Sequence, residues 1–295
     1  LDEALELRAA GISTPLLVLE GVGEASAVKT AADNDLALMV HSEAQAAWLR
    51  EARTDSPISV WLKVDTGMHR LGLEPDRLKA VIDDLRDSAG VPTVVCTHLS
   101  SAEETDNDAT ETQLEAFSDC VAGMELPLSI ANSAGILAWP ASHADWNRPG
   151  YMLYGSSPLP EPLEAATALR PAMTLRAEVI AIRQVATGDS VGYGGRWTAE
   201  KPSTIATVEI GYADGYPRHA PNGTPTFING RIAPLVGTVS MDMITLDVTG
   251  HEEAAVGDSV ELWGENVPVN DVAAASDTIG YELLTQVTSR VPRRY

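Results

Sequence analysis

The segment Val60–Gly72 reads VWLKVDTGMHRLG, an alternating apolar stretch that runs into charged residues and a glycine turn. The alternation predicts a strand over Val60–Asp65, with Lys63 and Asp65 on one face. A buried ammonium is costly unless it gains a partner or a modification. Two interpretations of Lys63 therefore stay open: a buried functional lysine, or an ion pair with Asp65 on an exposed face. Arg70, just past the turn, is either a binding residue or a solvated loop residue.

Short apolar runs of the same kind recur along the first half of the chain, with helical patterns between them. The candidate strands are Leu16–Glu20, Leu36–His41, Val60–Asp65, Thr93–His98, Leu128–Asn132 and Met152–Gly155. The candidate helices are Leu1–Gly11, Ser42–Thr54, Pro75–Ser88 and Asp108–Met124. Strands that alternate with helices at regular spacing predict βαβ units and a parallel sheet. In a parallel barrel, polar residues at the carboxyl ends of the strands form the site.

The number of strands bears on whether a barrel can close. Six strands are predicted, whereas a closed (β/α)8 barrel has eight, and at about 30 residues per unit the difference is roughly 60 residues. The first residue is Leu1 rather than a methionine, and it falls inside a helical pattern. We therefore expect an α/β fold with a TIM-type (β/α)8 barrel over residues 1–168, whose first two units precede Leu1 in the native product.

The pattern changes after about residue 168, where short β-rich segments separated by turns begin. These segments are Met173–Gln184, Thr204–Ile210, Thr226–Ile228, Met243–Val248 and Ser259–Leu262. Turn pairs such as Asn222-Gly223 and Asn229-Gly230 favour hairpins. A last helix is expected over Glu282–Arg290. Residues 169–295 are therefore predicted to form a separate antiparallel β domain.

Composition narrows the class of protein. Asp and Glu number 42 against 20 Lys and Arg, a formal net charge of −22, which repels nucleic acid and anionic membranes. No apolar run reaches the length of about 18 residues that a membrane span needs, and no secretory signal is visible. The two cysteines, Cys96 and Cys120, fit a reduced, cytoplasmic protein better than a disulfide framework.

Four more residues are candidates for a site because of where they fall in the predicted barrel. His98 ends a strand, although a lone histidine there is more often structural. Ser133 begins a helix, where a hydroxyl and backbone amides suit a phosphate as well as plain capping. Arg148 offers a guanidinium and Gly150 a backbone amide. The sequence contains no phosphate-binding glycine loop, serine-nucleophile elbow or metal-ligand cluster, so no metal site is expected.

Taken in order, the most specific segments resemble the alanine racemase family of fold-type III pyridoxal-phosphate enzymes. These segments are Lys63–Gly72, Tyr212–Gly215, Ser240–Asp242 and Gly280–Glu282. The resemblance runs from Glu3–Arg8 to Ser289–Tyr295, essentially the whole chain. It implies an isomerase with an eight-stranded barrel followed by a β domain, and pyridoxal 5'-phosphate as cofactor. It also implies a cytoplasmic head-to-tail homodimer that interconverts L-alanine and D-alanine, usually for peptidoglycan precursors.

The resemblance also assigns the proton transfers. Racemisation removes a proton on one face of the alanine Cα and returns one on the other, and the family uses a lysine and a tyrosine as the two bases. Tyr212 matches the tyrosine, and Tyr212 and Met241 would act on the cofactor held by the partner subunit. A free phenol has a pKa of about 10, so a neighbour must lower it, and His98 matches the family's candidate. The Met241 amide would lie near the substrate carboxylate, with Asp242 beside it.

Further matches concern the binding of cofactor and substrate. Arg148 matches the residue that donates a hydrogen bond to the pyridine nitrogen without transferring a proton. Arg70 would hold the phenolic oxygen of the cofactor and help orient the substrate carboxylate. Lys63 matches a lysine that is often carbamylated, and the carbamate would hold Arg70. The phosphate-binding groups would be Ser133, the Gly150 amide and Tyr281.

One feature departs from the family's pattern. The cofactor lysine of the family lies in a motif resembling Val-Lys-Ala-Asn-Ala-Tyr-Gly-His-Gly, which does not occur here. Besides Lys63, the chain contains only Lys29, Lys79 and Lys201, in helix and loop contexts. We therefore expect the second base to be a lysine absent from these residues and located upstream in the native product. The alternatives are a broad-specificity or serine racemase of the same fold, and a truncated, inactive scaffold.

Overall fold

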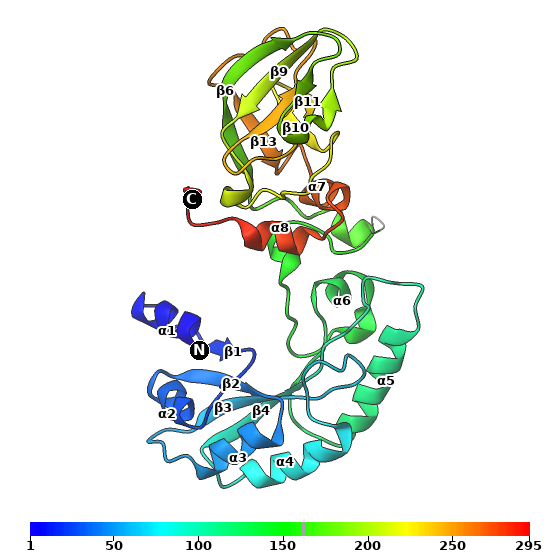
Figure 1. The fold of residues 1–295 in the computed structure, drawn as a ribbon. Coiled ribbons are helices and arrows are strands. Elements are labelled where there is room, and N and C mark those ends of the chain that lie inside the picture. The colour runs from blue at the N-terminus through cyan, green and yellow to red at the C-terminus, as the bar shows by residue number, and fades with distance from the viewer. Residues whose placement is uncertain (161–162) are drawn as a thin grey trace. The chain divides into compact units, whose positions relative to one another are not determined.

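A parallel sheet forms the first unit of the chain (Figure 1). Its strands occur in the order β1-β2-β3-β4-β5, and each neighbouring pair is parallel. The strands are β1 Leu16–Val18, β2 Leu36–Val40, β3 Ile58–Lys63, β4 Gly90–Cys96 and β5 Leu128–Ser129. The structure is a computed structural model that describes residues 1–160 and 163–295. The predicted parallel sheet is thus confirmed, with shifted strand ends.

Helices connect these strands, and α2 to α5 lie along one face of the sheet (Figure 1). The helices are α1 Asp2–Ala9, α2 Ser26–Asp33, α3 Glu43–Glu51, α4 Leu78–Leu85, α5 Ala109–Val121 and α6 Ser133–Ala138, with the 3-10 turns η1 Pro75–Arg77 and η2 Pro140–Ser142. Helices α2 to α5 each bury side chains against the rest of the unit, as α4 does with Leu78, Val81 and Leu85. Because parallel strands end at the same edge, the residues that follow β3, β4 and β5 are brought close together.

The predicted strand at Met152–Gly155 is wrong, because the chain there forms the 3-10 helix η3 Tyr151–Tyr154. The ring of Tyr151 stacks on that of Tyr281 with centroids 4.0 Å apart, and its hydroxyl donates to Asn270 at 2.5 Å. These contacts hold the apolar run in the second unit. A short apolar run alone cannot distinguish this outcome from a strand. In the described part of the chain the parallel sheet therefore has five strands rather than six.

The chain divides into two units. The first comprises Leu1–Gly150 and Leu159–Ala165, and the second comprises Tyr151–Pro158 and Ala166–Tyr295. The first has the half-barrel sheet expected of a barrel-like domain. Closure into eight strands, with two units ahead of Leu1, stays a prediction.

The second unit is built on an antiparallel sheet with the strand order β11-β10-β13-β6-β9-β12. The strands are β6 Leu175–Val185, β9 Ser203–Val208, β10 Pro225–Ile228, β11 Arg231–Pro234, β12 Ile244–Asp247 and β13 Ser259–Trp263, and the pair β7 Ser190–Val191 and β8 Trp197–Thr198 forms a separate ribbon. The predicted antiparallel domain is confirmed, although β11 and the ribbon were not predicted. Asn229 and Gly230 both have positive φ in the turn between β10 and β11, as a tight hairpin requires.

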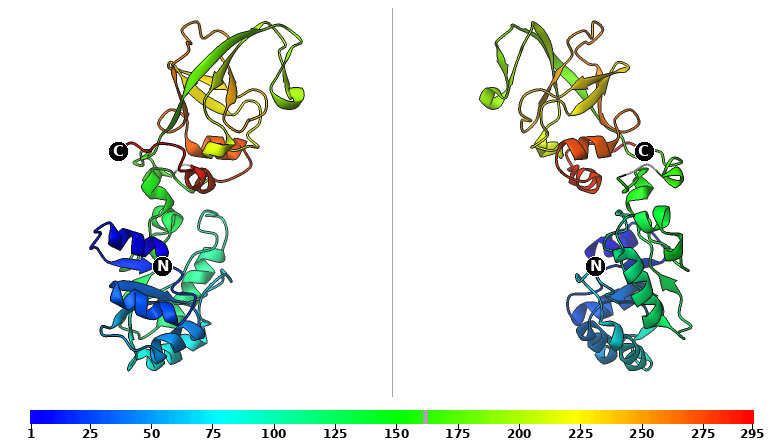
Figure 2. Two further views of the ribbon diagram at one scale, coloured as in Figure 1. Left: turned by 60° about the vertical axis from the view of Figure 1, so that its left-hand side comes forward. Right: turned by 90° about the vertical axis from the view of Figure 1, so that its right-hand side faces the viewer.

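Two helices close one end of this unit (Figure 2). They are α7 Val269–Ala275 and α8 Gly280–Gln286, which pack on each other. Besides η3, the 3-10 turns of the described second half are η4 Glu164–Ala166, η5 Tyr193–Gly195 and η6 Tyr212–Asp214. Helix α8 begins and ends earlier than the predicted helix Glu282–Arg290. The core contains the fully buried Val208, Leu246 and Trp263, and the Trp263 ring stacks with that of Tyr216. Burial of these side chains stabilises the unit by roughly 1.5–3 kcal/mol each.

Candidate active site

Lys63 is a buried lysine at the carboxyl edge of the parallel sheet. It is the last residue of β3, pairs in register with Cys96 at the end of β4, and is 8% exposed. Burial lowers the pKa of Lys63, and the nearby guanidiniums of Arg70 and Arg148 lower it further, although Cys96 and Asp65 act in the opposite direction. No carboxylate of residues 1–160 or 163–295 forms a salt bridge with any of these three cations. The edge is therefore a cation cluster short of negative charge.

The alternative of an exposed Lys63–Asp65 ion pair is wrong. Asp65 instead accepts hydrogen bonds from the backbone N–H groups of Gly67, Met68 and His69 at 2.9–3.0 Å. Burial raises the pKa of Asp65, but these amides and the nearby His69 outweigh it, so the pKa is lowered overall. Asp65 thus builds the turn after β3. The turn presents Arg70, whose side chain is exposed.

Arg148 is held against the ends of β4 and β5. Its Nη1 donates to the Ser129 hydroxyl at 2.5 Å, and its Nη2 donates to the carbonyls of Thr97 at 2.6 Å and Ile130 at 3.1 Å. Burial lowers the pKa of Arg148, although a guanidinium stays charged in proteins. These bonds leave Nε–H and one Nη1–H without an acceptor among the described residues. The guanidinium is therefore fixed in place and can still donate.

His98 lies beside Arg148, with 3.2 Å between its Nδ1 and the Arg148 Nη2. An arginine can only donate, so Nδ1 accepts and the ring proton is on Nε2. Burial lowers the pKa of His98 to about 4, and the charges of Arg148, Lys63 and Arg70 act in the same direction. His98 is thus a neutral imidazole at pH 7 whose Nε2–H can donate to another group.

Ser133 and Gly150 are brought together, as two groups expected to bind one phosphate must be. The N–H of Gly150 donates to the Ser133 hydroxyl at 3.0 Å. Asn132, rather than Ser133, caps helix α6 by accepting the N–H of Gly135 at 2.8 Å. The capping role that the sequence left open for Ser133 is therefore taken by Asn132.

In the second unit, Tyr212 and Met241 lie on adjoining turns. The N–H of Tyr212 donates to the Ser240 carbonyl at 3.1 Å, and the N–H of Ala213 donates to the Met241 carbonyl at 3.0 Å. Gly211 permits this approach, because a Cβ there would lie 2.3 Å from the Met241 carbonyl oxygen. The side chains of Tyr212 and Met241 are 40% and 53% exposed. The turns thus present a phenol and a thioether side chain at the surface of the unit.

Tyr281 is the second residue of helix α8 and is anchored by its stack on Tyr151. Gly280 allows this stack, because a Cβ at that position would overlap the Tyr151 hydroxyl. Burial raises the pKa of Tyr151 to about 12, so that hydroxyl stays protonated and donates to Asn270. Tyr151 therefore supports Tyr281 and is one of the residues that the sequence reasoning missed.

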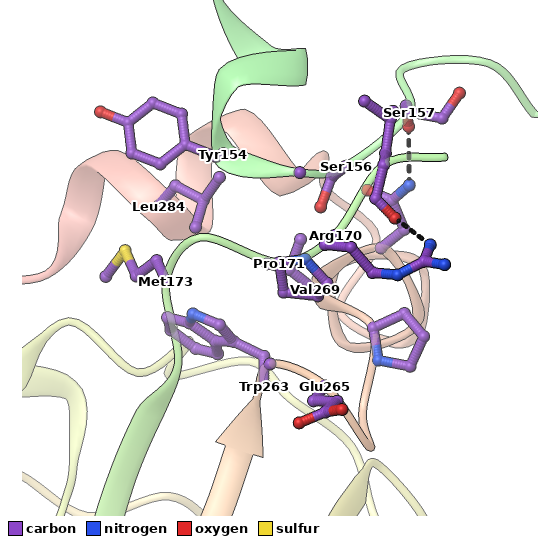
Figure 3. Close-up of a pocket in the computed structure, with 15 residues that line it drawn as sticks. Tyr154, Ser156, Ser157, Arg170, Pro171, Met173, Trp263, Glu265, Val269 and Leu284 are labelled. Carbon is purple, nitrogen blue, oxygen red and sulfur yellow. Dashed lines mark hydrogen bonds between the residues drawn. The ribbon is translucent and has the colours of Figure 1, made fainter. Parts of the chain in front are cut away.

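A pocket of about 440 Å³ in the second unit is separate from these residues (Figure 3). Trp263, Met173 and Leu284 form its apolar wall, and Arg170 lies on its other side. The Arg170 Nη1 donates to the carbonyls of Thr167 and Leu169. None of the residues predicted for the site lines this pocket.

Sequence reasoning also missed Ser129, which fixes Arg148. Its signal was a polar residue at the end of a strand whose other neighbours are apolar. The Thr97 and Ile130 carbonyls left no such signal, because any residue type supplies a carbonyl. The predicted residues of the first unit do gather: Lys63, His98 and Arg148 influence one another electrostatically.

A barrel-like domain with cations at its strand ends, followed by a second, β-rich domain, is typical of enzymes that bind an anionic ligand at that edge. Residues 1–158 match the family model "Alanine racemase, N-terminal domain", and residues 172–295 match "Alanine racemase, C-terminal domain". The chain belongs to the alanine racemase family, whose members are pyridoxal-phosphate-dependent isomerases. No helix in the described ranges is both long and apolar enough to cross a membrane.

Individual relatives agree with this assignment. The chain is 49% identical to the biosynthetic alanine racemase of Pseudomonas aeruginosa, over 100% of this chain and 83% of that protein. It is 47% identical to the alanine racemase of Alteromonas mediterranea, over 99% of this chain and 82% of that protein. The crystal structure of the Pseudomonas aeruginosa enzyme superposes with a TM-score of 0.94, and covers 100% of this chain and 83% of that one. The alanine racemase of Bartonella henselae, solved with covalently bound pyridoxal phosphate, is 30% identical with a TM-score of 0.87. The match covers 100% of this chain and 82% of that one.

Proposed function

We propose that this protein interconverts L-alanine and D-alanine with pyridoxal 5'-phosphate, by a two-base mechanism in which Tyr212 is one base. The observation that carries the proposal is the cation cluster of Lys63, Arg70 and Arg148 at one sheet edge, without a carboxylate partner among the described residues. In a chain of net charge −22, cations gathered in this way indicate an anionic ligand.

The residues of this edge fit the cofactor. Arg148 is fixed by four contacts yet keeps N–H groups that could donate to a pyridine nitrogen. Ser133 and the Gly150 amide, which lie together, would bind the phosphate. Tyr281, in the second unit, would be a further phosphate ligand. Bound pyridoxal phosphate would acidify the Cα–H of an attached amino acid by delocalising the charge that deprotonation leaves.

Lys63 would carry a carbamate that holds Arg70. A carbamate forms from the neutral amine and carbon dioxide, and the lowered pKa of Lys63 increases the fraction of neutral amine. The modification replaces a buried positive charge with a negative one, which removes the repulsion from Arg70 and Arg148. Arg70 is then oriented to bind the phenolic oxygen of the cofactor and the substrate carboxylate.

Tyr212 would remove or return the proton on one face of the substrate Cα. The neutral His98 supports this role, because its Nε2–H can donate to the phenolic oxygen and stabilise a phenolate. The second base would be a lysine other than those present here. Lys29 and Lys79 pair with aspartates on exposed helix faces, and Lys201 lies in an exposed loop.

The active form would be a cytoplasmic homodimer in which Tyr212 and Met241 complete the site of the partner subunit. Their exposure supports this arrangement, because both side chains are available to a second chain. The Met241 amide would lie near the substrate carboxylate. In this reading the half-barrel unit of one chain and the β unit of the other form one site.

The direct test is to incubate the purified full-length protein and pyridoxal phosphate with L-alanine, L-serine or L-lysine and to measure the D-enantiomer by chiral chromatography. We expect D-alanine to form fastest. A preference for serine or lysine would instead support a broad-specificity or serine racemase. Failure to bind the cofactor, measured by its absorbance after dialysis, would support the inactive scaffold and contradict the proposal.

A further inference from the structure

Three segments of the second unit meet at the Tyr212 turn. Residues 211–215 bond to residues 240–243 through the Tyr212 and Ala213 amides described above. The Ser240 N–H donates to the Met243 carbonyl at 2.9 Å, so Met241 and Asp242 occupy the tip of a tight turn. The third segment is the tail that follows α8, residues 287–290.

Arg290 contacts a carboxylate in each of the two turns. Its Nη2 donates to the Asp242 Oδ1 at 2.7 Å, and its Nε lies 3.5 Å from the Asp214 Oδ1. The other oxygen of Asp214 accepts the N–H of Gly211 at 2.9 Å. The guanidinium therefore spans the turn that carries Tyr212 and the turn that carries Met241.

The tail is fixed to the Tyr212 turn without Arg290. The N–H of Thr288 donates to the Asp214 carbonyl at 3.1 Å, and the Thr288 hydroxyl donates to the Ala213 carbonyl at 3.0 Å. Gly215 packs against the Gln286 carbonyl, where a Cβ would lie only 2.4 Å from the oxygen. What Arg290 adds is the link from this anchored tail to the tip of the other turn, at Asp242.

We infer that Arg290 is a positioning residue that sets the spacing between Tyr212 and the Met241 amide. The inference rests on the proposed function, and extends it to the residue that holds the two groups in register. Proton transfer and carboxylate binding must act on one substrate together. Because the Tyr212 turn is held without Arg290, loss of Arg290 would displace mainly the Met241 amide and weaken binding of the substrate carboxylate. Arg290 touches neither substrate nor cofactor in this account.

A purely structural role does not explain the placement of Arg290. The side chains of Arg290 and Asp242 are 52% and 50% exposed, and exposed ion pairs contribute little to folding. A planar guanidinium offers donors in a fixed fork, so it can fix two carboxylates at once, whereas an ammonium is a single point charge. The contacts of Arg290 are thus better suited to aligning the two turns than to stabilising the fold.

The test compares Arg290→Gln with Arg293→Gln in the holoenzyme. Arg293 lies three residues beyond Arg290, and among the described residues its side chain bonds only to the Val287 carbonyl, at 3.1 Å, so its loss is the matched control. We expect Arg290→Gln to raise the KM for alanine about tenfold, the equivalent of one charge-assisted hydrogen bond, with a smaller change in kcat. Arg290→Lys should restore part of the affinity, and Arg293→Gln should match the wild type.

Two further measurements separate alignment from unfolding. In the cofactor-free protein, Arg290→Gln should speed hydrogen exchange at the amides of residues 240–243 while the melting temperature stays unchanged. Adding Asp242→Asn to Arg290→Gln should raise KM no further, because both changes break the same link. An unchanged KM in Arg290→Gln, an equal effect of Arg293→Gln, or additive effects with Asp242→Asn would each overturn the inference. Failure of the proposed function would show separately, as a wild-type protein that does not racemise alanine.

Discussion

The hydrogen bond from Arg148 to His98 determines which imidazole nitrogen is left to act. Because Arg148 can only donate, His98 accepts at Nδ1 and keeps its proton on Nε2. The surrounding cations and burial keep the ring neutral. In the proposed site, this neutral N–H donor would stabilise the Tyr212 phenolate, which a tyrosine base requires.

Replacement of the phenol gives the first prediction at the residue scale. In the holoenzyme, Tyr212→Phe should lower racemisation in both directions by about 10²–10⁴-fold, the range typical of a lost general acid or base. One enantiomer loses the base that takes its proton, and the other loses the donor that returns it. Initial rates from L-alanine and from D-alanine, measured by chiral chromatography, check this. Near-normal rates would remove Tyr212 from the mechanism.

The low pKa of His98 predicts a loss of stability in acid. The pKa is about 4 in the folded chain and about 6.5 in an unfolded one, so protonation favours unfolding. The contribution is complete above pH 6.5 and is lost as the pH falls towards 4, by about 3 kcal/mol at most. Thermal unfolding of the cofactor-free protein between pH 7 and 4 tests this. His98→Gln keeps an acceptor for Arg148 and should lose less stability over that range; an identical pH dependence would contradict the assignment.

At the scale of elements, the sheet edges position the site. β3, β4 and β5 each end in a residue that contributes: Lys63, Cys96 beside it, and Ser129. In the β unit, the close approach of two turns depends on Gly211. Where two backbone segments approach this closely, there is no room for a Cβ, so a glycine there cannot be replaced without moving the backbone.

Gly211→Ala tests that approach. Its φ of −149° suits any residue, so the effect is purely steric: the new Cβ would lie 2.3 Å from the Met241 carbonyl oxygen and would push the two turns apart. We expect a loss of about 1–3 kcal/mol in the free energy of unfolding, measured by urea denaturation, and a lower kcat/KM for alanine. Gly23→Ala is the control, since no atom lies within 4 Å of its new Cβ. Equal behaviour of the two variants would contradict the role of Gly211.

The sequence predicted the elements better than their contacts. Alternating apolar runs located β2, β3 and the main strands of the β unit, because burial of one face dictates that period. The strand predicted at Met152–Gly155 was wrong because these apolar residues belong to a 3-10 helix, whose Tyr151 stacks on the distant Tyr281. Ser129 and Arg290 escaped notice for a similar reason: their partners are close only after folding.

At the scale of the whole molecule, the proposed site is divided between two units. Lys63, His98 and Arg148 belong to the half-barrel unit, and Tyr212 and Met241 belong to the β unit. If the β unit of one chain completes the site of its partner, a defect in the half-barrel unit and a defect in the β unit can be placed in different subunits of one dimer. Cyclic symmetry then gives each dimer two equivalent sites, each built from both chains.

The most direct measurement mixes two inactive variants, Arg148→Gln and Tyr212→Phe, and allows their subunits to exchange. Each mixed dimer contains one site with an intact Arg148 and an intact partner Tyr212. Random exchange should therefore restore about a quarter of the wild-type conversion of L-alanine to D-alanine. Activity that stays at the level of the separate variants, while mass spectrometry shows mixed dimers, would contradict a racemase site shared between two chains.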